Sequence, residues 1–310
     1  MATADQIYAL AASALSFDRG RAESIIRQIH AAESRKGNAL SNRLNRLLNS
    51  RSGALIDQEH PVLQRLKAER LDQMALIESP AHSLDDLLLP ESVRVAVDDL
   101  LAGYRHRERL AEFKLPVPHR LLLSGPPGNG KTSLAGAIAH ALGLVFVTLD
   151  PGRVINSHLG ETGANLSKLM TALNGMDCVL FIDEMEALLS SKQKAATGEG
   201  GDREMARTLA ALQMQIDRLS DQTLLIGATN YPEMLDHGVP RRFDQQLELP
   251  MPDTAVREQM LERLALRYQG IPFEAIGMSA HNTDGFCLDE IEKRYIRSAR
   301  SWVIRNAGSQ

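Results

Sequence analysis

Residues 121–132 read LLLSGPPGNGKT, in which a short apolar run leads into a glycine-rich loop. The last eight of these residues match the pattern G-x-x-x-x-G-K-[ST] in full. Glycines let backbone N–H groups converge on phosphate oxygens, and the positive end of a helix adds to the attraction. Helical sequence follows over 132–142, so the stretch predicts a strand, a phosphate-binding loop and a helix in that order.

The loop also supplies side chains suited to a nucleoside triphosphate and its metal ion. Lys131 can reach the β- and γ-phosphates, and the hydroxyl group of Thr132 can bind Mg²⁺. A chance glycine-rich turn is the alternative, but the strand before the loop and the helix after it argue against that interpretation. We therefore expect ATP and Mg²⁺ as ligands. The residues expected to bind the nucleotide are Gly125, Pro126, Pro127, Gly128, Asn129, Gly130, Lys131, Thr132 and Ser133.

A second apolar run ends in two carboxylates, since residues 178–186 read CVLFIDEME. Asp183 is suited to hold the Mg²⁺ ion together with Thr132. Glu184 can accept a proton from an attacking water molecule, or orient that molecule. Acidic residues after a strand are common, but here they follow a phosphate-binding loop. An acid at Glu184 favours hydrolysis of the nucleotide over binding alone.

Two further segments carry candidate catalytic side chains. Asn230 ends the run TLLIGATN at 223–230, and the carboxyl ends of parallel strands meet at one crevice. Asn230 would then lie between the γ-phosphate and the water, although an asparagine that starts a turn is the plain alternative. Arg241 and Arg242 lie in the segment VPRRFD at 239–244, where a solvated surface pair is the ordinary interpretation.

The order of the apolar runs predicts the fold class. Short apolar runs alternate with helical sequence, which indicates an α/β fold with a parallel sheet flanked by helices. These runs lie at 121–124, 145–150, 178–183 and 223–229. We expect four divisions of the chain: a helical N-terminal partner-binding region at 1–50, a linker at 51–83, an α/β nucleotide-binding domain at 84–252, and a small helical domain at 253–310. Within the linker we expect one short helix, at 62–77.

Composition weighs against several classes of function. The formal net charge of −4 and the aromatic content of 4% give no support for nucleic-acid binding. The two cysteines, Cys178 and Cys287, fit neither a disulfide framework nor a metal site, so we expect a reducing compartment. The apolar stretch at 141–149 is too short to cross a bilayer, and the N-terminus lacks the features of a signal peptide. We therefore expect a cytoplasmic protein without a membrane partner.

The segments GPPGNGKT, VLFIDEME, LLIGATN and PRRFD, in this order, resemble an AAA+ ATPase. The order and the ending RRFD-x-x-x-x-x-P are similar to the protein-remodelling branch, which includes katanin- and spastin-like ATPases and proteasomal ATPases, here in a short bacterial-type chain. The resemblance covers about residues 84–307 and implies a P-loop NTPase sheet followed by a helical lid domain. It also implies a ring, usually hexameric, with ATP between neighbours, so Arg241 and Arg242 would reach the site of the next subunit.

The same resemblance points to further parts of the nucleotide pocket. Leu87 and Leu88 would help to wall the adenine. The segment NTDGFCLDEIEK at 282–293 is similar to a family segment near the adenine and ribose, with Gly285 at the matching glycine. Asp289 departs from the family pattern and has no assigned role.

Residues 156–161, NSHLGE, match a loop that points into the central pore in the remodelling branch. Leu159 and Gly160 fit that pattern, whereas His158 stands where an aromatic residue often grips the substrate. An imidazole ring would give a weaker or pH-sensitive grip, and a surface histidine with no special role is the alternative. The polar loop at 190–204 lies where the family has a second pore loop, with a solvated linker as the default interpretation.

Three functions are compatible with these features. The first is an ATP-hydrolysing ring that remodels, unfolds or threads a protein partner. The second is a nucleotide-controlled assembly switch that regulates a bound partner without threading, which the departure at His158 favours. The third is a DNA-remodelling motor, which the acidic balance disfavours. The N-terminal helices would choose the partner, and the resemblance to short bacterial ATPases suggests a subtilisin-like protease.

Overall fold

The computed structural model describes residues 60–306 except 79, 81, 150, 152–153, 155–161 and 190–198. The predicted N-terminal helices and the predicted pore residues His158, Leu159 and Gly160 therefore lie outside the described residues. All described residues belong to one compact unit, Gln58–Gln310.

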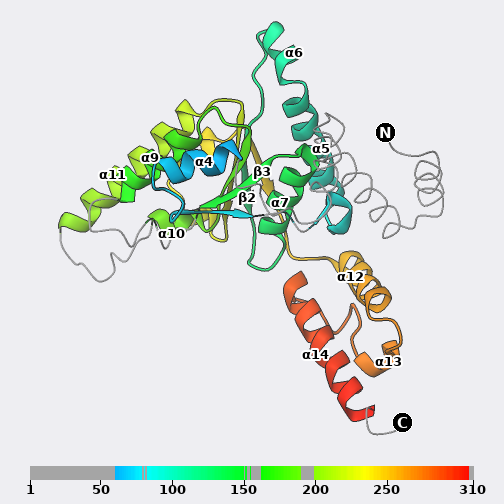
Figure 1. Cartoon of the computed structure of the whole chain (residues 1–310). Coiled ribbons are helices and arrows are strands. Elements are labelled where there is room, and N and C mark those ends of the chain that lie inside the picture. The colour runs from blue at the N-terminus through cyan, green and yellow to red at the C-terminus, as the bar shows by residue number, and fades with distance from the viewer. Residues whose placement is uncertain are drawn as a thin grey trace, which may run out of the picture. The chain divides into compact units, whose positions relative to one another are not determined.

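A six-stranded sheet forms the centre of the α/β part (Figure 1). The strands are β1 (Ala75–Glu78), β2 (Arg120–Ser124), β3 (Val145–Leu149), β4 (Cys178–Ile182), β5 (Thr223–Thr229) and β6 (Gln245–Glu248). Their order across the sheet is β1-β3-β4-β5-β2-β6. The four predicted apolar runs form β2 to β5, which pair in parallel, and this confirms the predicted α/β class. Their carboxyl ends point to one edge of the sheet, where ligands bind in such folds.

The two outermost strands differ from the prediction. The helix expected over 62–77 is α4 (Pro61–Ala68) and ends early, and the chain returns as β1, antiparallel to β3. The sheet is therefore mixed, and it begins inside the segment 51–83 that we expected to be a linker. β6, with the sequence QQLE, pairs in parallel with β2 and has alternate residues half-buried and exposed. Both are edge strands of four residues, and their sequences ALIE and QQLE are short and only partly apolar.

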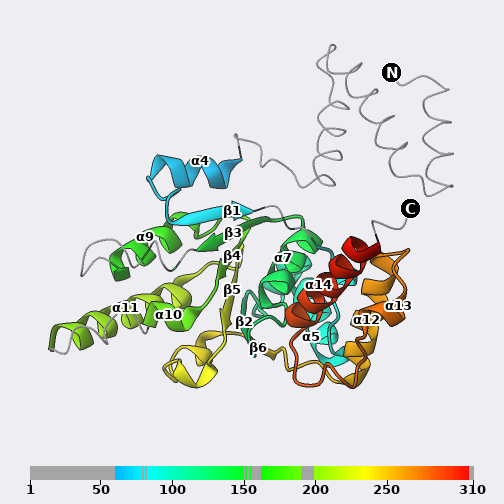
Figure 2. The same ribbon diagram turned by 90° about the horizontal axis from the view of Figure 1, so that it is seen from below.

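Each face of the sheet carries its own layer of helices (Figure 2). One face packs α4, α9 (Thr162–Leu173), α10 (Met185–Leu189) and α11 (Glu199–Arg218). The other face packs α5 (Glu91–Arg105) and α7 (Lys131–Leu142). Within β4, Leu180 and Ile182 belong to the first core, whereas Val179 and Phe181 belong to the second. This alternation explains why the central strands read as unbroken apolar runs, because both faces are buried.

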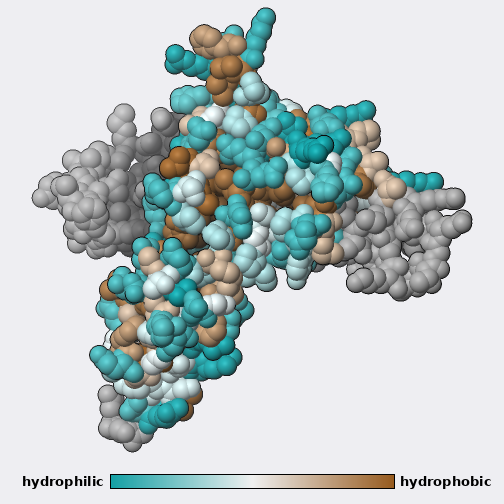
Figure 3. Space-filling view, turned by 180° about the vertical axis from the view of Figure 1, so that it is seen from behind, coloured by the Kyte–Doolittle hydropathy of each residue, from teal (hydrophilic) through white to brown (hydrophobic). Residues whose placement is uncertain are grey.

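The short helix α6 (Arg107–Glu112) forms a projection at the edge of this part. Apolar side chains gather on its surface (Figure 3). Phe113 and Leu115, just after α6, are 68% and 53% exposed. A projection with exposed large apolar side chains is suited to contact with another surface.

The C-terminal helices have a core of their own. They are α12 (Thr254–Arg267), α13 (Phe273–Ile276) and α14 (Leu288–Asn306), and they lie in the segment 253–310 that was expected to be helical. Their buried residues are Leu261, Leu264, Ile276, Ile291, Tyr295 and Ala299. Arg257, a buried residue of α12, donates from its guanidinium group to the Ala280 and Pro252 carbonyl oxygens at 2.9 and 2.8 Å. No helix in the described part of the chain is both long and apolar enough to span a bilayer.

Candidate nucleotide site

A pocket of about 940 Å³ opens at the carboxyl edge of the sheet, where the phosphate loop, the strand ends and the C-terminal helices converge. One part of its wall is polar and comes from the loop and the strand ends: Pro127, Gly128, Gly130, Lys131, Thr132, Ser133, Asp183, Glu184 and Asn230. The other part comes from residues before α5 and from α12 and α14: His82, Asp85, Asp86, Leu87, Leu88, Met260, Arg263, Leu264, Arg267, Leu288, Asp289 and Glu292. The pocket volume lies at the upper end of the range for small-molecule sites.

The phosphate loop requires its glycines for backbone conformation and for close packing. Gly128 and Gly130 have φ angles of 78° and 87°, a region that residues with side chains rarely adopt. A Cβ atom at Gly125 would collide with the Leu249 carbonyl group, and one at Gly128 would lie 2.7 Å from the Cys287 Sγ atom. Helix α7 begins at Lys131, directly after Gly130, so its free N–H groups face the pocket.

Lys131 supplies a buried cation beneath the loop. Its ammonium group donates to the Gly125 and Pro126 carbonyl oxygens at 2.7 and 2.9 Å. Burial lowers the pKa of Lys131, and the nearby carboxylates of Asp183 and Glu186 act against that shift. The loop carbonyls therefore hold this cation at the polar end of the pocket, where phosphate groups would meet it.

Thr132 and Asp183 meet across the pocket floor. The Thr132 hydroxyl, from α7, donates to Asp183 Oδ2 at 3.0 Å at the end of β4. A hydroxyl and a carboxylate oxygen are the hard ligands that Mg²⁺ prefers. The donor set therefore fits the predicted metal ion, with room in the pocket for water and phosphate oxygens.

Glu184 lies beside this pair in an unusual backbone conformation. Its φ angle is 45°, and its N–H group donates to Asp183 Oδ1 at 2.9 Å. The left-handed region costs a residue with a side chain about 1–3 kcal/mol, and such strain gathers at functional sites. The strained turn leaves the Glu184 side chain exposed and on the pocket wall.

Asn230 follows β5 and lines the same pocket, as predicted from its place after an apolar run. Its backbone N–H group donates to Glu186 Oε1 at 3.1 Å. Glu186 is only 8% exposed, and its Oε2 atom has no hydrogen-bond partner in the described part of the chain. Glu186 was not among the predicted site residues. Its acidic character two residues after Glu184 was the available signal, but only the fold shows that it links the end of β4 to Asn230.

Residues 121–251 match the family described as "ATPase family associated with various cellular activities (AAA)". These residues form an AAA ATPase domain. An uncharacterized AAA family ATPase from Sinorhizobium fredii is 32% identical over 203 residues, which cover 65% of this chain and 59% of that protein. The proteasome-activating nucleotidase of Pyrococcus horikoshii is 30% identical over 212 residues, which cover 65% of this chain and 53% of that protein. The chain thus spans about half the length of these curated relatives.

Solved structures agree with this assignment at the level of the fold. The crystal structure of the FIGL-1 AAA domain is 23% identical, with a TM-score of 0.59 and coverage of 82% of each chain. The same domain in complex with ADP is 22% identical, again with a TM-score of 0.59. The predicted P-loop NTPase fold with a C-terminal helical region is therefore confirmed.

The two arginines of the AAA domain have different surroundings. Both lie in the short 3-10 helix η4 (Pro240–Arg242), and neither lines the pocket among the described residues. Arg242 donates to Asp217 Oδ2 at 3.0 Å and to the Gly238 carbonyl oxygen at 2.6 Å, which fixes it to its own chain. Arg241 is exposed, and its side chain forms no hydrogen bond or ion pair with the described residues. Of the two arginines, only Arg241 therefore has a side chain without a partner among the described residues.

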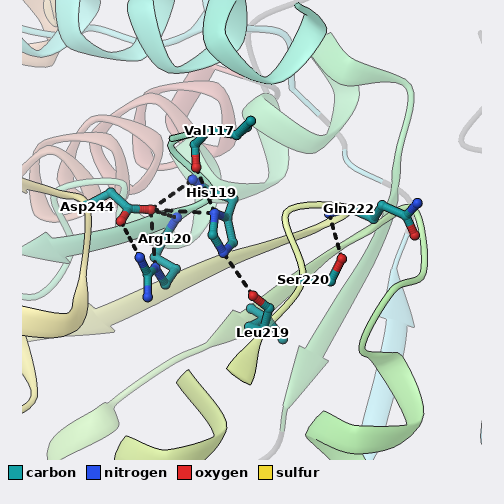
Figure 4. Close-up of polar contacts among 7 residues, drawn as sticks. All are labelled: Val117, His119, Arg120, Leu219, Ser220, Gln222 and Asp244. Atoms are coloured by element: carbon teal, nitrogen blue, oxygen red, sulfur yellow. Dashed lines mark hydrogen bonds and ion pairs between the residues drawn. The ribbon is translucent and has the colours of Figure 1, made fainter. Parts of the chain in front are cut away.

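A polar cluster anchors this arginine segment to the sheet of the AAA domain (Figure 4). Asp244 Oδ2 accepts from the backbone N–H groups of His119 and Arg120, each at 3.0 Å, and Arg120 donates to Asp244 Oδ1 at 2.6 Å. Burial would raise the pKa of Asp244, but the hydrogen bonds from Arg120 and His119 lower it below its usual value. The His119 ring lies 2.8 and 3.2 Å from the Val117 and Leu219 carbonyl oxygens. These bonds hold the start of β2 and the segment before β6 together.

Several other predicted binding residues do not line the pocket, although Leu87 and Leu88 do, as expected. The Asn129 side chain donates to the Pro250 carbonyl oxygen at 2.9 Å and accepts from the Leu288 N–H group at 3.4 Å, so it ties the loop to α14. Gly125 and Pro126 contribute carbonyl groups to Lys131 rather than pocket wall. Gly285 lies outside the pocket wall, with a φ angle of 74° in the turn before α14.

Proposed function

We propose that this chain binds ATP with Mg²⁺ in the pocket and hydrolyses it at the polar end. The observation that carries the proposal is the convergence of Lys131, the Thr132–Asp183 pair and Glu184 on one wall. A buried cation, a hard-ligand pair and a carboxylate are the three kinds of group that phosphoryl transfer to water requires. The AAA relatives and the ADP complex of the FIGL-1 AAA domain support the same ligand class.

Each side chain has a distinct role in this proposal. Lys131 donates to β- and γ-phosphate oxygens, exchanging its loop carbonyl partners for phosphate. Thr132 and Asp183 hold Mg²⁺, which neutralises charge on the β- and γ-phosphates when bound. Glu184 takes a proton from the attacking water or orients it, and Asn230 holds that water from the end of β5. Arg241 of a neighbouring subunit offsets charge on the γ-phosphate, and Arg242 holds the segment in place.

The biological role that we propose is remodelling of a protein partner by a hexameric ring. Two observations support it: the related proteins include proteasome-activating nucleotidases, and the exposed residues after α6 offer an apolar contact to a neighbour. Residues 1–50 would bind the partner, for which a subtilisin-like protease is our candidate, and the protein would act in the cytoplasm. The alternative is an assembly switch without threading, which His158 at the predicted pore position favours.

Replacement of Lys131 by alanine tests the nucleotide site. The wild-type chain should gain about 2.7 kcal/mol of stability against unfolding at an ADP concentration one hundred times the dissociation constant. Lys131→Ala should weaken ADP binding about tenfold to a hundredfold, because a charged hydrogen-bond donor is lost. Isothermal titration calorimetry with ADP and Mg²⁺, together with thermal unfolding, measures both quantities.

The matched control is Lys67→Ala, since Lys67 is an exposed lysine at the end of α4, outside the pocket. That variant should bind ADP as the wild type does. Equal ADP affinity in Lys131→Ala and Lys67→Ala would show that the loop is not the phosphate site.

A further inference from the structure

Asp289 stands in the pocket wall next to the phosphate loop. Its backbone N–H group donates to the Gly128 carbonyl oxygen at 3.1 Å. A Cβ atom built at Gly128 would lie 3.2 Å from Asp289 Cβ, so the side chain begins directly beside the loop. The first N–H groups of α14 therefore find their acceptors in the phosphate loop, which fixes the place of Asp289.

The chemistry of the groups that line the pocket indicates which part of a nucleotide Asp289 would meet. Lys131 and Thr132 mark the phosphate end, whereas Leu87, Met260 and Leu264 supply apolar wall suited to a base. Asp289 lines the same pocket, directly after the apolar Leu288, and lies against Gly128 of the phosphate loop. A nucleotide carries its ribose between base and phosphate, and a carboxylate suits neither an apolar base face nor a phosphate group, so the ribose is the part that suits Asp289.

The chemistry of the side chain agrees with this placement. A carboxylate accepts hydrogen bonds and repels phosphate, and the ribose hydroxyl groups are the donors that a nucleotide offers in that position. Lys293 donates to Asp289 Oδ2 at 2.6 Å, which leaves Oδ1 with acceptor capacity. An acidic residue that binds ribose hydroxyls is a recurrent device in nucleotide sites of other folds.

We propose that Asp289 accepts a hydrogen bond from a ribose hydroxyl group and makes this pocket selective for ribonucleotides over deoxyribonucleotides. The proposal rests on the proposed function, since it requires that the pocket holds a nucleotide.

A purely structural role is the competing explanation, and the chain contains a matched control for it. Asp289 and Glu290 both lie in the first turn of α14, and each pairs with a basic residue four positions on, Lys293 or Arg294. Their side chains are 49% and 41% exposed. Only Asp289 lines the pocket, so a role in helix stability predicts the same effect for both residues, and ribose binding predicts an effect for Asp289 alone.

The test is calorimetric titration of the full chain with ADP, 2′-deoxy-ADP and 3′-deoxy-ADP in the presence of Mg²⁺. These ligands are not hydrolysed at the γ position, so binding is measured at equilibrium. The wild type should bind ADP about tenfold more tightly than at least one deoxy analogue, since a hydrogen bond to a charged group is lost. Asp289→Ala should remove that preference by weakening ADP and any analogue that keeps the hydroxyl group bound by Asp289, and Glu290→Ala should keep the preference.

Each other outcome overturns the proposal. Equal affinity of the wild type for the three ligands shows that neither ribose hydroxyl group contributes to binding. Tighter binding of all three ligands to Asp289→Ala shows that the carboxylate acts by repelling phosphate. If Asp289→Ala fails to fold, Asp289→Asn replaces it, keeps an acceptor without the charge, and should reduce the preference. If the wild-type chain binds none of the three ligands, the nucleotide site itself is contradicted. That result differs from equal binding of all three, which contradicts only the role of Asp289.

Discussion

Replacement of Arg241 by alanine is expected to reduce the rate of ATP hydrolysis about a thousandfold, the lower end of the effect of an arginine supplied across an interface. The guanidinium group is exposed and lacks a partner among the described residues of its own chain. Asp244, three residues after Arg241, is hydrogen-bonded to His119 and Arg120 at the start of β2. The backbone that carries Arg241 is therefore held in place. A cation held ready for the neighbouring γ-phosphate stabilises the transition state without the cost of reorganisation.

The measurement is phosphate release at saturating ATP, with the assembly state followed by analytical ultracentrifugation. Arg242→Ala is the informative comparison, because Arg242 is already bound to Asp217 and Gly238. It should lower the unfolding temperature and reduce activity less than Arg241→Ala does. Arg305→Ala, at the end of α14, should leave the rate unchanged. Wild-type activity in Arg241→Ala would remove this residue from the mechanism.

Replacement of Glu184 by glutamine is expected to reduce ATP hydrolysis by about a hundredfold or more while nucleotide binding persists. A positioned general base contributes about 10²–10⁴ to a rate, and glutamine is close in shape but a poor proton acceptor. The backbone turn at Glu184 rests on its N–H bond to Asp183, which the substitution retains. Phosphate release and ATP binding are measured on the same preparation. Glu78→Gln, on the exposed edge strand β1, serves as the control.

The same variant separates the two proposed biological roles, because it should hold ATP without turning it over. A partner that stays bound with an extended, protease-sensitive segment supports remodelling. A partner that stays bound in its folded form supports the assembly switch. A hydrolysis rate equal to that of the wild type would contradict the assignment of Glu184.

The central fold could be predicted because its determinants are local. The strands β2 to β5 are buried on both faces, so they read as apolar runs, and the glycine pattern places the loop between β2 and α7. The edge strands β1 and β6 were missed because ALIE and QQLE are short and only partly apolar. Pairing with a neighbour, rather than sequence propensity, determines such strands.

The polar end of the site could also be predicted from the sequence, since Lys131, Asp183 and Asn230 all follow strands of one sheet. The part of the wall that α12 supplies could not, because Met260 and Arg263 reach the pocket only through the packing of that helix. Nor does the dipeptide Arg241-Arg242 reveal that one arginine is bound to Asp217 and the other is free. That difference depends on α11, which is distant in sequence and adjacent in space.

The most direct test of hydrolysis across a subunit interface is to mix Glu184→Gln chains with Arg241→Ala chains and to measure phosphate release. Each variant alone should be inactive, but an interface that joins the intact Glu184 of one chain to the intact Arg241 of its neighbour should be active. In an equal mixture, random assembly predicts such a pairing at about a quarter of the interfaces. Each interface has two different sides, and each side is occupied by the required variant in about half of the cases. Recovery of activity on mixing, with subunit exchange verified by fluorescence energy transfer, is the predicted result. Exchange of subunits without any recovery would contradict a shared site.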